Sequence, residues 1–358
     1  MLYARSVMNT IPSIFNKTLP SYTVVGGRDI GFSGSRGFHE NRGSTGLSAI
    51  LLNRGRAFSR RNLFYDLEKT GFDTIISIEP FPPAYDVEEL AAQFPFVRFI
   101  LLQQPLSFGE QINLAVSELD TPLFFVLWND LKFVAGGSAR RMAERLLCSD
   151  NGSGENEAHY KRFCTVPVIQ TSRFVTLPTL MVPALQHKKI RTLFLGPTSE
   201  GLLSLYPFDG IGIYDRSRFI RLGGFDGTIK SSYWQLMDLG FRAYLWGEEI
   251  SSTQTLKLSY ETTIPAEENT DGTDYKRFYL KNLAPVFQGD CARLPVRRFP
   301  GFLLRTGGGI SRSWEDFSES RRWVYDNRFR WQYAPKTVIN RWDPVSAEEQ
   351  FFPGNGRY

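Results

Sequence analysis

The stretch Leu123–Asp130 reads LFFVLWND, an apolar run of strand length that stops at an Asn-Asp pair. A short, continuous apolar run of this kind is typical of a strand buried on both faces of a parallel sheet. Ligands of open α/β sheets bind outside the carboxyl ends of the strands, where a carboxylate can hold a divalent cation. The strand expected at Thr74–Ile78 also ends at an acid, Glu79. Two strand-end acids favour a nucleotide site at one edge of the sheet.

Short apolar strands alternate with amphipathic helices of about ten residues through the first half of the chain. This alternation predicts an α/β fold with a Rossmann-type, mostly parallel sheet flanked by helices. Two of the helices carry capping boxes, Asp86 with Glu89 and Ser107 with Glu110, and Ser59 is expected to cap another. The strands are expected at Leu47–Leu52, Thr74–Ile78, Val97–Leu102, Leu123–Leu127, Phe163–Ile169 and Gly210–Tyr214, and later helices at Ser138–Cys148, Ser232–Trp246 and Ser313–Arg330, the last capped by Ser313 with Asp316.

Three parts of the chain differ in composition. Residues 1–43 are rich in Gly, Ser, Asn and Arg, with little periodicity, and predict a flexible leader. Residues 44–255 carry the alternating pattern of the α/β domain. Residues 256–358 form a C-terminal extension, helical or irregular, that is rich in Arg and Trp.

Composition limits the chemistry. The three cysteines form no CxxC pair and the three histidines have no metal-ligand spacing, so acid–base and metal roles are expected to fall to carboxylates. The chain has no long apolar segment and no signal-peptide pattern near its start, which predicts a cytoplasmic protein.

Positive charge is concentrated between Arg293 and Trp342, where arginines are interspersed with four tryptophans. Such a region can contact an anionic acceptor or the inner face of a membrane, as a peripheral protein does. It can equally be a solvated surface around a packed aromatic core. No nucleic-acid-binding motif accompanies it, and no nucleic-acid partner is expected.

The order and spacing of several motifs resemble a family 2 glycosyltransferase with the GT-A fold, over about residues 45–250. The Gly-Gly-Phe-Asp turn of that family is matched letter for letter by Gly223–Asp226. The other corresponding segments are Leu52-Asn53-Arg54 for the Tyr-Asn-Arg-like loop, Glu79 for the nucleobase acid, Gln111-Ile112-Asn113 for Ala-Arg-Asn, Trp128-Asn129-Asp130 for the DxD motif and Gln235–Arg242 for EDVDLGLR.

The resemblance implies a hexosyltransferase-type enzyme (EC 2.4) that moves a sugar from a nucleotide-diphosphate sugar to a glycan or lipid-linked acceptor, as in cell-envelope polysaccharide synthesis. Asp130 would hold Mn²⁺ or Mg²⁺, which neutralises the charge of the diphosphate leaving group. Asp238 or Asp226 would serve the acceptor or take its proton, and Trp234 and Arg242 would contact the acceptor. The donor would be bound by Asn53, Arg54, Glu79, Asn113, Asn129 and Asp130.

Two positions depart from the family pattern: Trp128 replaces the first acid of the DxD motif, and Leu236 stands where the general base is expected. A catalytically inactive nucleotide-binding or scaffolding subunit with the GT-A fold therefore remains an alternative, as does a nucleotidyltransferase. Purely structural roles also remain open for the expected catalytic and acceptor residues. Asp238 and Arg242 can form an i,i+4 ion pair, and Asp226 can simply form a turn.

Overall fold

The computed structural model describes residues 21–26, 44–54, 60–80, 82–150, 162–186, 189–265, 272–306 and 309–342. A π-helical turn, η3 (Tyr279–Leu283), follows the helix Thr273–Phe278. The strands are β1 (Tyr22–Gly26), β2 (Leu47–Leu52), β3 (Ile75–Pro80), β4 (Val97–Leu102), β5 (Leu123–Trp128), β6 (Leu131–Phe133), β7 (Arg162–Gln170), β8 (Leu180–Gln186), β9 (Lys189–Leu195), β10 (Gly212–Asp215), β11 (Glu249–Tyr260), β12 (Val286–Gln288) and β13 (Cys291–Arg293). The helices are α1 (Arg60–Glu68), α2 (Val87–Gln93), α3 (Phe108–Ser117), α4 (Ser138–Asp150), α5 (Arg216–Leu222), α6 (Ser232–Leu245), α7 (Thr273–Phe278), α8 (Phe299–Thr306), α9 (Ile310–Asp326) and α10 (Pro335–Asn340).

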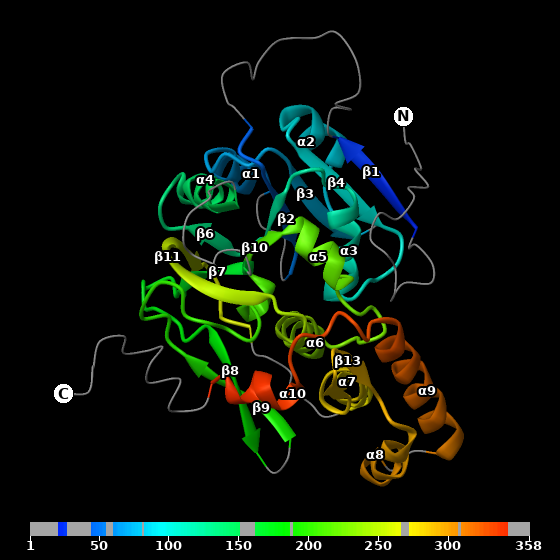
Figure 1. Ribbon diagram of the computed structural model, residues 1–358. Coiled ribbons are helices and arrows are strands. Elements are labelled where there is room, and N and C mark those ends of the chain that lie inside the picture. The colour runs from blue at the N-terminus through cyan, green and yellow to red at the C-terminus, as the bar shows by residue number, and fades with distance from the viewer. Residues whose placement is uncertain are drawn as a thin grey trace, which may run out of the picture.

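A nine-stranded sheet in the order β1-β4-β3-β2-β5-β10-β7-β11-β6 forms the centre of the molecule (Figure 1). Strands β4, β3, β2 and β5 are parallel, and β7 and β11 continue in the same direction, whereas β1, β10 and β6 run antiparallel to their neighbours. The predicted α/β fold with a mostly parallel sheet is therefore confirmed. The chain moves from β2 outward to β3 and β4, then returns to β5 on the other side of β2. This reversal creates a crevice position at the carboxyl ends of β2 and β5.

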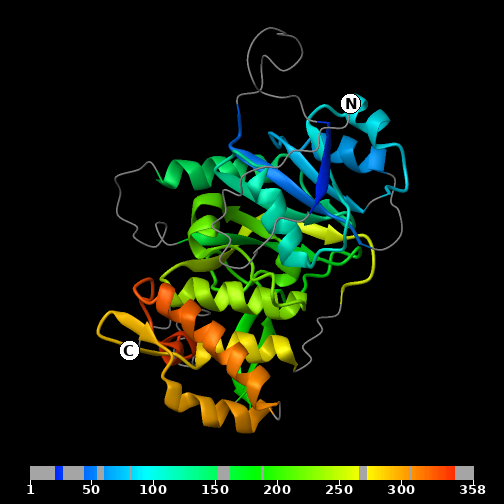
Figure 2. The same ribbon diagram turned by 90° about the vertical axis from the view of Figure 1, so that its right-hand side faces the viewer.

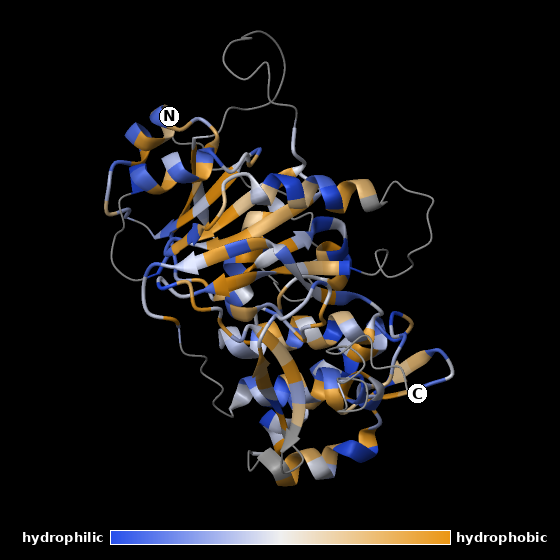
Figure 3. Ribbon diagram, turned by 90° about the vertical axis from the view of Figure 1, so that its left-hand side faces the viewer, coloured by the Kyte–Doolittle hydropathy of each residue, from blue (hydrophilic) through white to orange (hydrophobic). Residues whose placement is uncertain are grey.

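The strands of the sheet consist largely of hydrophobic residues, and the helices that cover it carry both hydrophobic and hydrophilic residues (Figure 3). All six residues of β2 are buried, as a central strand covered on both faces requires. The helices α6 to α10 lie together below the sheet, and the β8–β9 hairpin lies beside them (Figures 1 and 2). No helix within the described residues is both long and apolar enough to cross a membrane.

Local sequence signals predicted several elements accurately. The bounds of β2 and β4 are those expected, and β5 extends one residue further, to Trp128. The capping box of Ser107 and Glu110 is present at the start of α3, and Asp86 accepts a hydrogen bond from the backbone of Glu89 at the start of α2.

Other expectations were wrong. The expected leader contains an ordered strand, β1, which pairs antiparallel with β4 at the edge of the sheet. Helix α9 begins at Ile310 after Gly309, so Ser313 is a buried residue inside the helix and not its cap. The expected cap at Ser59 lies outside the described residues. The boundary expected at residue 255 falls inside β11, which runs unbroken from Glu249 to Tyr260.

The C-terminal helices share the hydrophobic core of the sheet domain. Trp323 of α9 stacks on Trp246 at the end of α6, with ring centroids 6.2 Å apart. Trp342 meets Tyr244 of α6 edge-on at 4.9 Å. Trp323, Trp331 and Trp342 are all buried. Three of the four tryptophans of the extension are thus part of an aromatic core.

Candidate functional site at the carboxyl ends of the strands

Arg54 lies just beyond the carboxyl end of β2, where Leu52 is in register with Trp128 of β5. Its guanidinium group spans the carboxylate of Asp130: Nε donates to Oδ2 at 3.0 Å, and a terminal nitrogen donates to Oδ1 at 3.1 Å. This bidentate geometry is the strongest arrangement of an arginine and a carboxylate. The parallel pairing of β2 with β5 therefore brings two of the expected site residues into direct contact.

A second carboxylate, Asp209, binds the other side of the same guanidinium group. A terminal nitrogen of Arg54 donates to Asp209 Oδ2 at 2.6 Å, and the hydroxyl of Tyr260 donates to the same oxygen at 2.9 Å. Asp209 has a positive φ of 53°, which a non-glycine residue adopts at a cost. Its turn before β10 is held by the indole of Trp128, which donates to the Asp209 carbonyl at 2.9 Å.

Burial has the largest single effect on the pKa values of Asp209 and Arg54. It raises the pKa of Asp209 to about 6, even though Arg54 opposes the shift. Burial works against the charge of Arg54, but Asp130 and Asp209 more than compensate, and the Arg54 pKa is raised further above its usual range. Arg54 therefore stays protonated at every accessible pH, while Asp209 changes charge close to neutrality.

Arg54 still has donors available for a ligand. A guanidinium group has five N–H groups, and the three hydrogen bonds to Asp130 and Asp209 leave two without a partner among the described residues. The side chain is 23% exposed, and it lies 4.4 Å from the centroid of the Trp128 ring. We call Arg54, Asp130, Asp209, Tyr260 and Trp128 the arginine cluster.

Asn129 fixes the backbone of Arg54 through its side-chain amide. Its side chain accepts from the backbone N–H of Arg54 at 3.2 Å and donates to the Arg54 carbonyl at 3.1 Å. Both polar atoms of the amide are thus used to fix the backbone of Arg54. The structure gives Asn129 a positioning role at the site.

Glu79, the other expected strand-end acid, lies at the same edge of the sheet in a separate buried cluster. It is 2% exposed and accepts hydrogen bonds from Ser77 at 2.7 Å, Asn53 at 2.9 Å and Arg60 at 3.2 Å. Burial and the neighbouring Glu79 charge raise the pKa of Tyr85, which bonds to Arg60. These contacts make Glu79 the centre of a polar network.

The two clusters are joined through consecutive residues, since Asn53 binds Glu79 and Arg54 binds Asp130. The Asn53 Oδ1 atom is buried and has no hydrogen-bond partner in the described structure. A cavity of about 380 Å³ opens nearby between α1 and β6, lined by Asn129, Lys132 and Glu261 among others. Neither Glu79 nor Asp130 lines that cavity.

Asn113 of α3 holds the Gly-Gly-Phe-Asp turn. Its amide donates to the Phe225 carbonyl at 2.8 Å and accepts from the Phe225 N–H at 2.9 Å. The backbone passes so close that a Cβ atom on Gly224, which has a φ of +66°, would lie 2.4 Å from Asn113 Oδ1. The structure thus brings Asn113 to this turn and not to Arg54.

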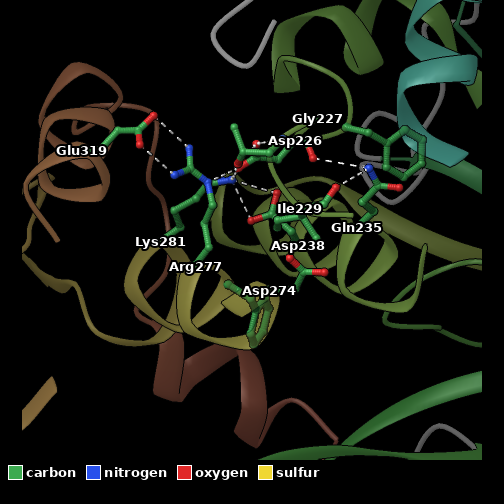
Figure 4. A network of polar contacts seen from close by, with 12 residues as sticks. Asp226, Gly227, Ile229, Gln235, Asp238, Asp274, Arg277, Lys281 and Glu319 are labelled. Atoms are coloured by element: carbon green, nitrogen blue, oxygen red, sulfur yellow. Dashed lines mark hydrogen bonds and ion pairs between the residues drawn. The ribbon is translucent and has the colours of Figure 1, made fainter. Parts of the chain in front are cut away.

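Asp226 and Asp238, the expected catalytic acids, come together below the surface around Lys281 (Figure 4). Lys281 Nζ lies 2.8 Å from an oxygen of each carboxylate, and all three side chains are fully buried. Asp226 also pairs with Arg277 at 2.9 Å, and Asp238 pairs with Arg242 at 3.1 Å. Because Lys281 and Arg277 come from η3 and α7, this network fastens the C-terminal helices to α6 and to the Gly-Gly-Phe-Asp turn.

Burial and the neighbouring opposite charges shift the pKa values of this network in opposite directions. Burial alone would raise the pKa of Asp226, but Lys281 and Arg277 hold it well below its usual range. Burial lowers the pKa of Lys281 and of Arg242. Arg242 also donates to the carbonyls of Leu222 and Gly224, at 3.0 and 2.7 Å.

Trp234 is buried as well. It packs on Tyr233, Tyr275 and Phe278, with ring centroids 4.8 to 5.4 Å apart. The expected acceptor residues Trp234 and Arg242 therefore lie in the packing between α6 and the C-terminal helices.

The expected Mn²⁺ or Mg²⁺ site was tested on the donor atoms that Asp130 offers. Its Oδ1 accepts from Arg54, and its Oδ2 accepts from Arg54 and from the Thr262 hydroxyl at 2.8 Å. Within the described residues no three His, Cys, Asp or Glu side chains gather as a metal-binding group. As arranged, these residues do not fit a resident divalent ion, because a guanidinium group already spans the carboxylate.

Sequence reasoning missed Asp209, Tyr260 and Lys281. Asp209 stands in Pro-Phe-Asp-Gly, which is typical of an ordinary turn. Tyr260 is the last residue of β11, and its place at the carboxyl end of a strand was the only sequence signal that could have indicated a site residue. Lys281 follows no periodic pattern that would predict its burial.

Comparison with known proteins gave matches at the level of structure. No protein-family model and no curated protein matches the sequence. The structure resembles that of GalNAc-T7 with UDP, GalNAc and Mn²⁺, with a TM-score of 0.50, 10% identity and coverage of 81% of this chain and 57% of that chain. It also resembles S. aureus TarS (TM-score 0.44, 10% identity, 85% and 47% covered) and the mannosyltransferase PcManGT from Pyrobaculum calidifontis with GDP-Man and Mn²⁺ (0.38, 8%, 86% and 88%).

This chain therefore spans about half the length of the GalNAc-T7 and TarS chains. At these identities the likeness concerns the fold. Together with the strand order, it shows that the chain has the GT-A fold of glycosyltransferases.

Proposed function

We propose that this chain is a glycosyltransferase that moves a sugar from a nucleoside-diphosphate sugar to a glycan or lipid-linked acceptor. The observation that carries the proposal is the arginine cluster at the carboxyl edge of a GT-A sheet. Arg54 is held there by two carboxylates and keeps two N–H groups that have no hydrogen-bond partner among the described residues. The structure of GalNAc-T7, which has the same fold, contains UDP and GalNAc.

In this proposal Arg54 supplies the positive charge for the diphosphate. As the bond between the sugar and the diphosphate breaks, negative charge develops on the leaving oxygen, and a fixed cation stabilises it. A guanidinium group suits this task because its N–H groups match phosphate oxygens in pairs. Asp130, Asp209 and Asn129 position Arg54.

Asn53 is the proposed contact to the nucleoside. Its Oδ1 atom is a buried acceptor without a described partner, and such an atom is costly unless a donor reaches it. A ribose hydroxyl or a base N–H would supply that donor. Glu79 lies beside it and fixes the Asn53 amide.

Asp226 and Asp238 enter the proposal as positioning residues, because both are fully buried in ion pairs. They hold the Gly-Gly-Phe-Asp turn and α6, together with Asn113 and Arg242, at one fixed place beside the sheet. Trp234 contributes to the same packing.

Contact with a lipid-linked acceptor is proposed at α8 and α9. Leu304, Ile310 and Trp314 are 86%, 69% and 45% exposed, and Arg297, Arg298 and Arg312 are exposed near them in sequence. Exposed apolar residues among arginines are typical of surfaces that bind anionic lipid headgroups.

A thermal-shift panel of nucleoside diphosphates tests the proposal, with and without Mn²⁺, on the wild type and on Asp130→Ala. We expect at least one nucleotide to raise the melting temperature of the wild type and to lose that effect in the variant, since Asp130 fixes Arg54. Stabilisation that survives Asp130→Ala unchanged, or no stabilisation by any nucleotide, contradicts the proposal.

A further inference from the structure

The C-terminal region contains a groove of about 850 Å³ between β13 and α9. The two walls are tied together by the backbone, since Ala292 N–H donates to the Arg328 carbonyl at 2.9 Å. Four arginines line the groove, Arg293 from the β13 wall and Arg321, Arg322 and Arg328 from the α9 wall. No acidic residue of the described part of the chain lines it. β13 and α9 also lie side by side in both ribbon views (Figures 1 and 2).

The charges of the groove are not neutralised within the described structure. Arg293, Arg321 and Arg322 are exposed, and their side chains make no hydrogen bond or ion pair with the described residues. Arg328 donates only to the carbonyl of Tyr325, at 2.6 Å, and therefore also keeps its charge. Four like charges this close repel one another, and an anion would relieve that repulsion.

The spacing along α9 indicates a ligand with several anionic groups. Ser318, Arg321, Arg322 and Tyr325 each lie three or four residues from another member of the set, so they form one stripe along α9. With a rise of about 1.5 Å per residue, the stripe is about 10 Å long, and Arg328 extends it in the turn that follows the helix end at Asp326. A single phosphate fills neither this length nor the volume of the groove.

We propose that this groove binds an anion that carries two or more phosphate groups. Guanidinium groups bind phosphate oxygens in pairs. The Arg328 guanidinium group lies 4.0 Å from the centroid of the Tyr325 ring. Tyr325 is nevertheless 60% exposed, so its ring can contact the part of the ligand that lies between phosphates. A concave groove can enclose a soluble anion, whereas the flat surface of a bilayer would contact only the rim of the groove. The proposal does not depend on the transfer reaction proposed above.

Isothermal titration with inorganic tripolyphosphate tests the proposal. We expect the wild type to bind it with an affinity that falls steeply with added NaCl, and Arg321→Gln/Arg322→Gln to bind at least tenfold more weakly. Arg312→Gln is the matched control, because Arg312 is an exposed arginine of the same helix that does not line the groove. Arg54→Met should keep the tripolyphosphate site that Arg321→Gln/Arg322→Gln loses, which separates this groove from the arginine cluster.

Three results would overturn the proposal: equal binding by the double variant and the wild type, equal weakening by Arg312→Gln, or loss of binding in Arg54→Met. Arg293→Gln, on the opposite wall, provides a second variant if the double variant fails to fold. Binding to phosphatidylglycerol vesicles without any binding of tripolyphosphate would also refute it, because the ligand would then be a membrane surface.

Discussion

The guanidinium group of Arg54 and the carboxylate of Asp130 form two nearly parallel hydrogen bonds of 3.0 and 3.1 Å at the carboxyl edge of the sheet. Their residues follow two strands that are adjacent in space but 76 positions apart in the sequence. The pair fixes the guanidinium group of Arg54, whose raised pKa keeps it protonated, at this edge of the sheet. This relationship leads to the following predictions.

Nucleotide binding should depend on pH through Asp209, whose pKa is raised to about 6 by burial. A bound diphosphate adds negative charge beside Asp209 and raises that pKa further, so binding takes up a proton. Affinity should therefore fall as the pH rises through about 6, by at most about tenfold per pH unit for one proton. Titrations from pH 5 to 8 should show this slope in the wild type and not in Asp209→Asn. An equal slope in both proteins would assign the proton to another group.

Removing Lys281 should strongly destabilise the protein. Lys281→Met leaves Asp226 and Asp238 buried without their shared cation, and breaking a buried ion pair on one side costs about 3–5 kcal/mol. Urea unfolding measures this loss in the free energy of unfolding. Lys257→Met, at an exposed lysine on β11, is the control and should change stability by less than about 0.5 kcal/mol. Similar stability of both variants would show that the network does not fasten the C-terminal helices.

Gly240 should tolerate no side chain. A Cβ atom there would lie 2.1 Å from the Leu205 carbonyl oxygen, in the segment that leads to Asp209. Gly240→Ala should therefore lower the free energy of unfolding by about 1–3 kcal/mol and weaken nucleotide binding. Gly301→Ala is the matched control, since its Cβ meets nothing within 4 Å on α8, and it should stabilise slightly. A neutral Gly240→Ala would mean that α6 and this segment separate easily.

How much the sequence predicts depends on the range of the interactions. Strands β2 and β4 follow from local apolar runs bounded by turns, and the strand-end position of Arg54 and Asp130 follows from their place after β2 and β5. Asp209 could not be predicted, because it meets Arg54 from 155 residues away through a loop without a repeating pattern. Asp226 and Asp238 were expected to serve the acceptor or take its proton, but both are fully buried in ion pairs with Lys281. That burial depends on Lys281, whose position the sequence pattern does not indicate.

The central claim is that Arg54 provides the cation for the diphosphate. Isothermal titration of the nucleoside diphosphate selected in the thermal-shift panel, in the presence of EDTA, tests it most directly. The account predicts binding by the wild type and by Arg61→Met, an exposed control on α1. It predicts about tenfold to hundredfold weaker binding by Arg54→Met, the cost of losing charge-assisted hydrogen bonds of about 1.5–3 kcal/mol. Unchanged affinity in Arg54→Met, or wild-type binding that appears only when Mn²⁺ is added, would contradict it.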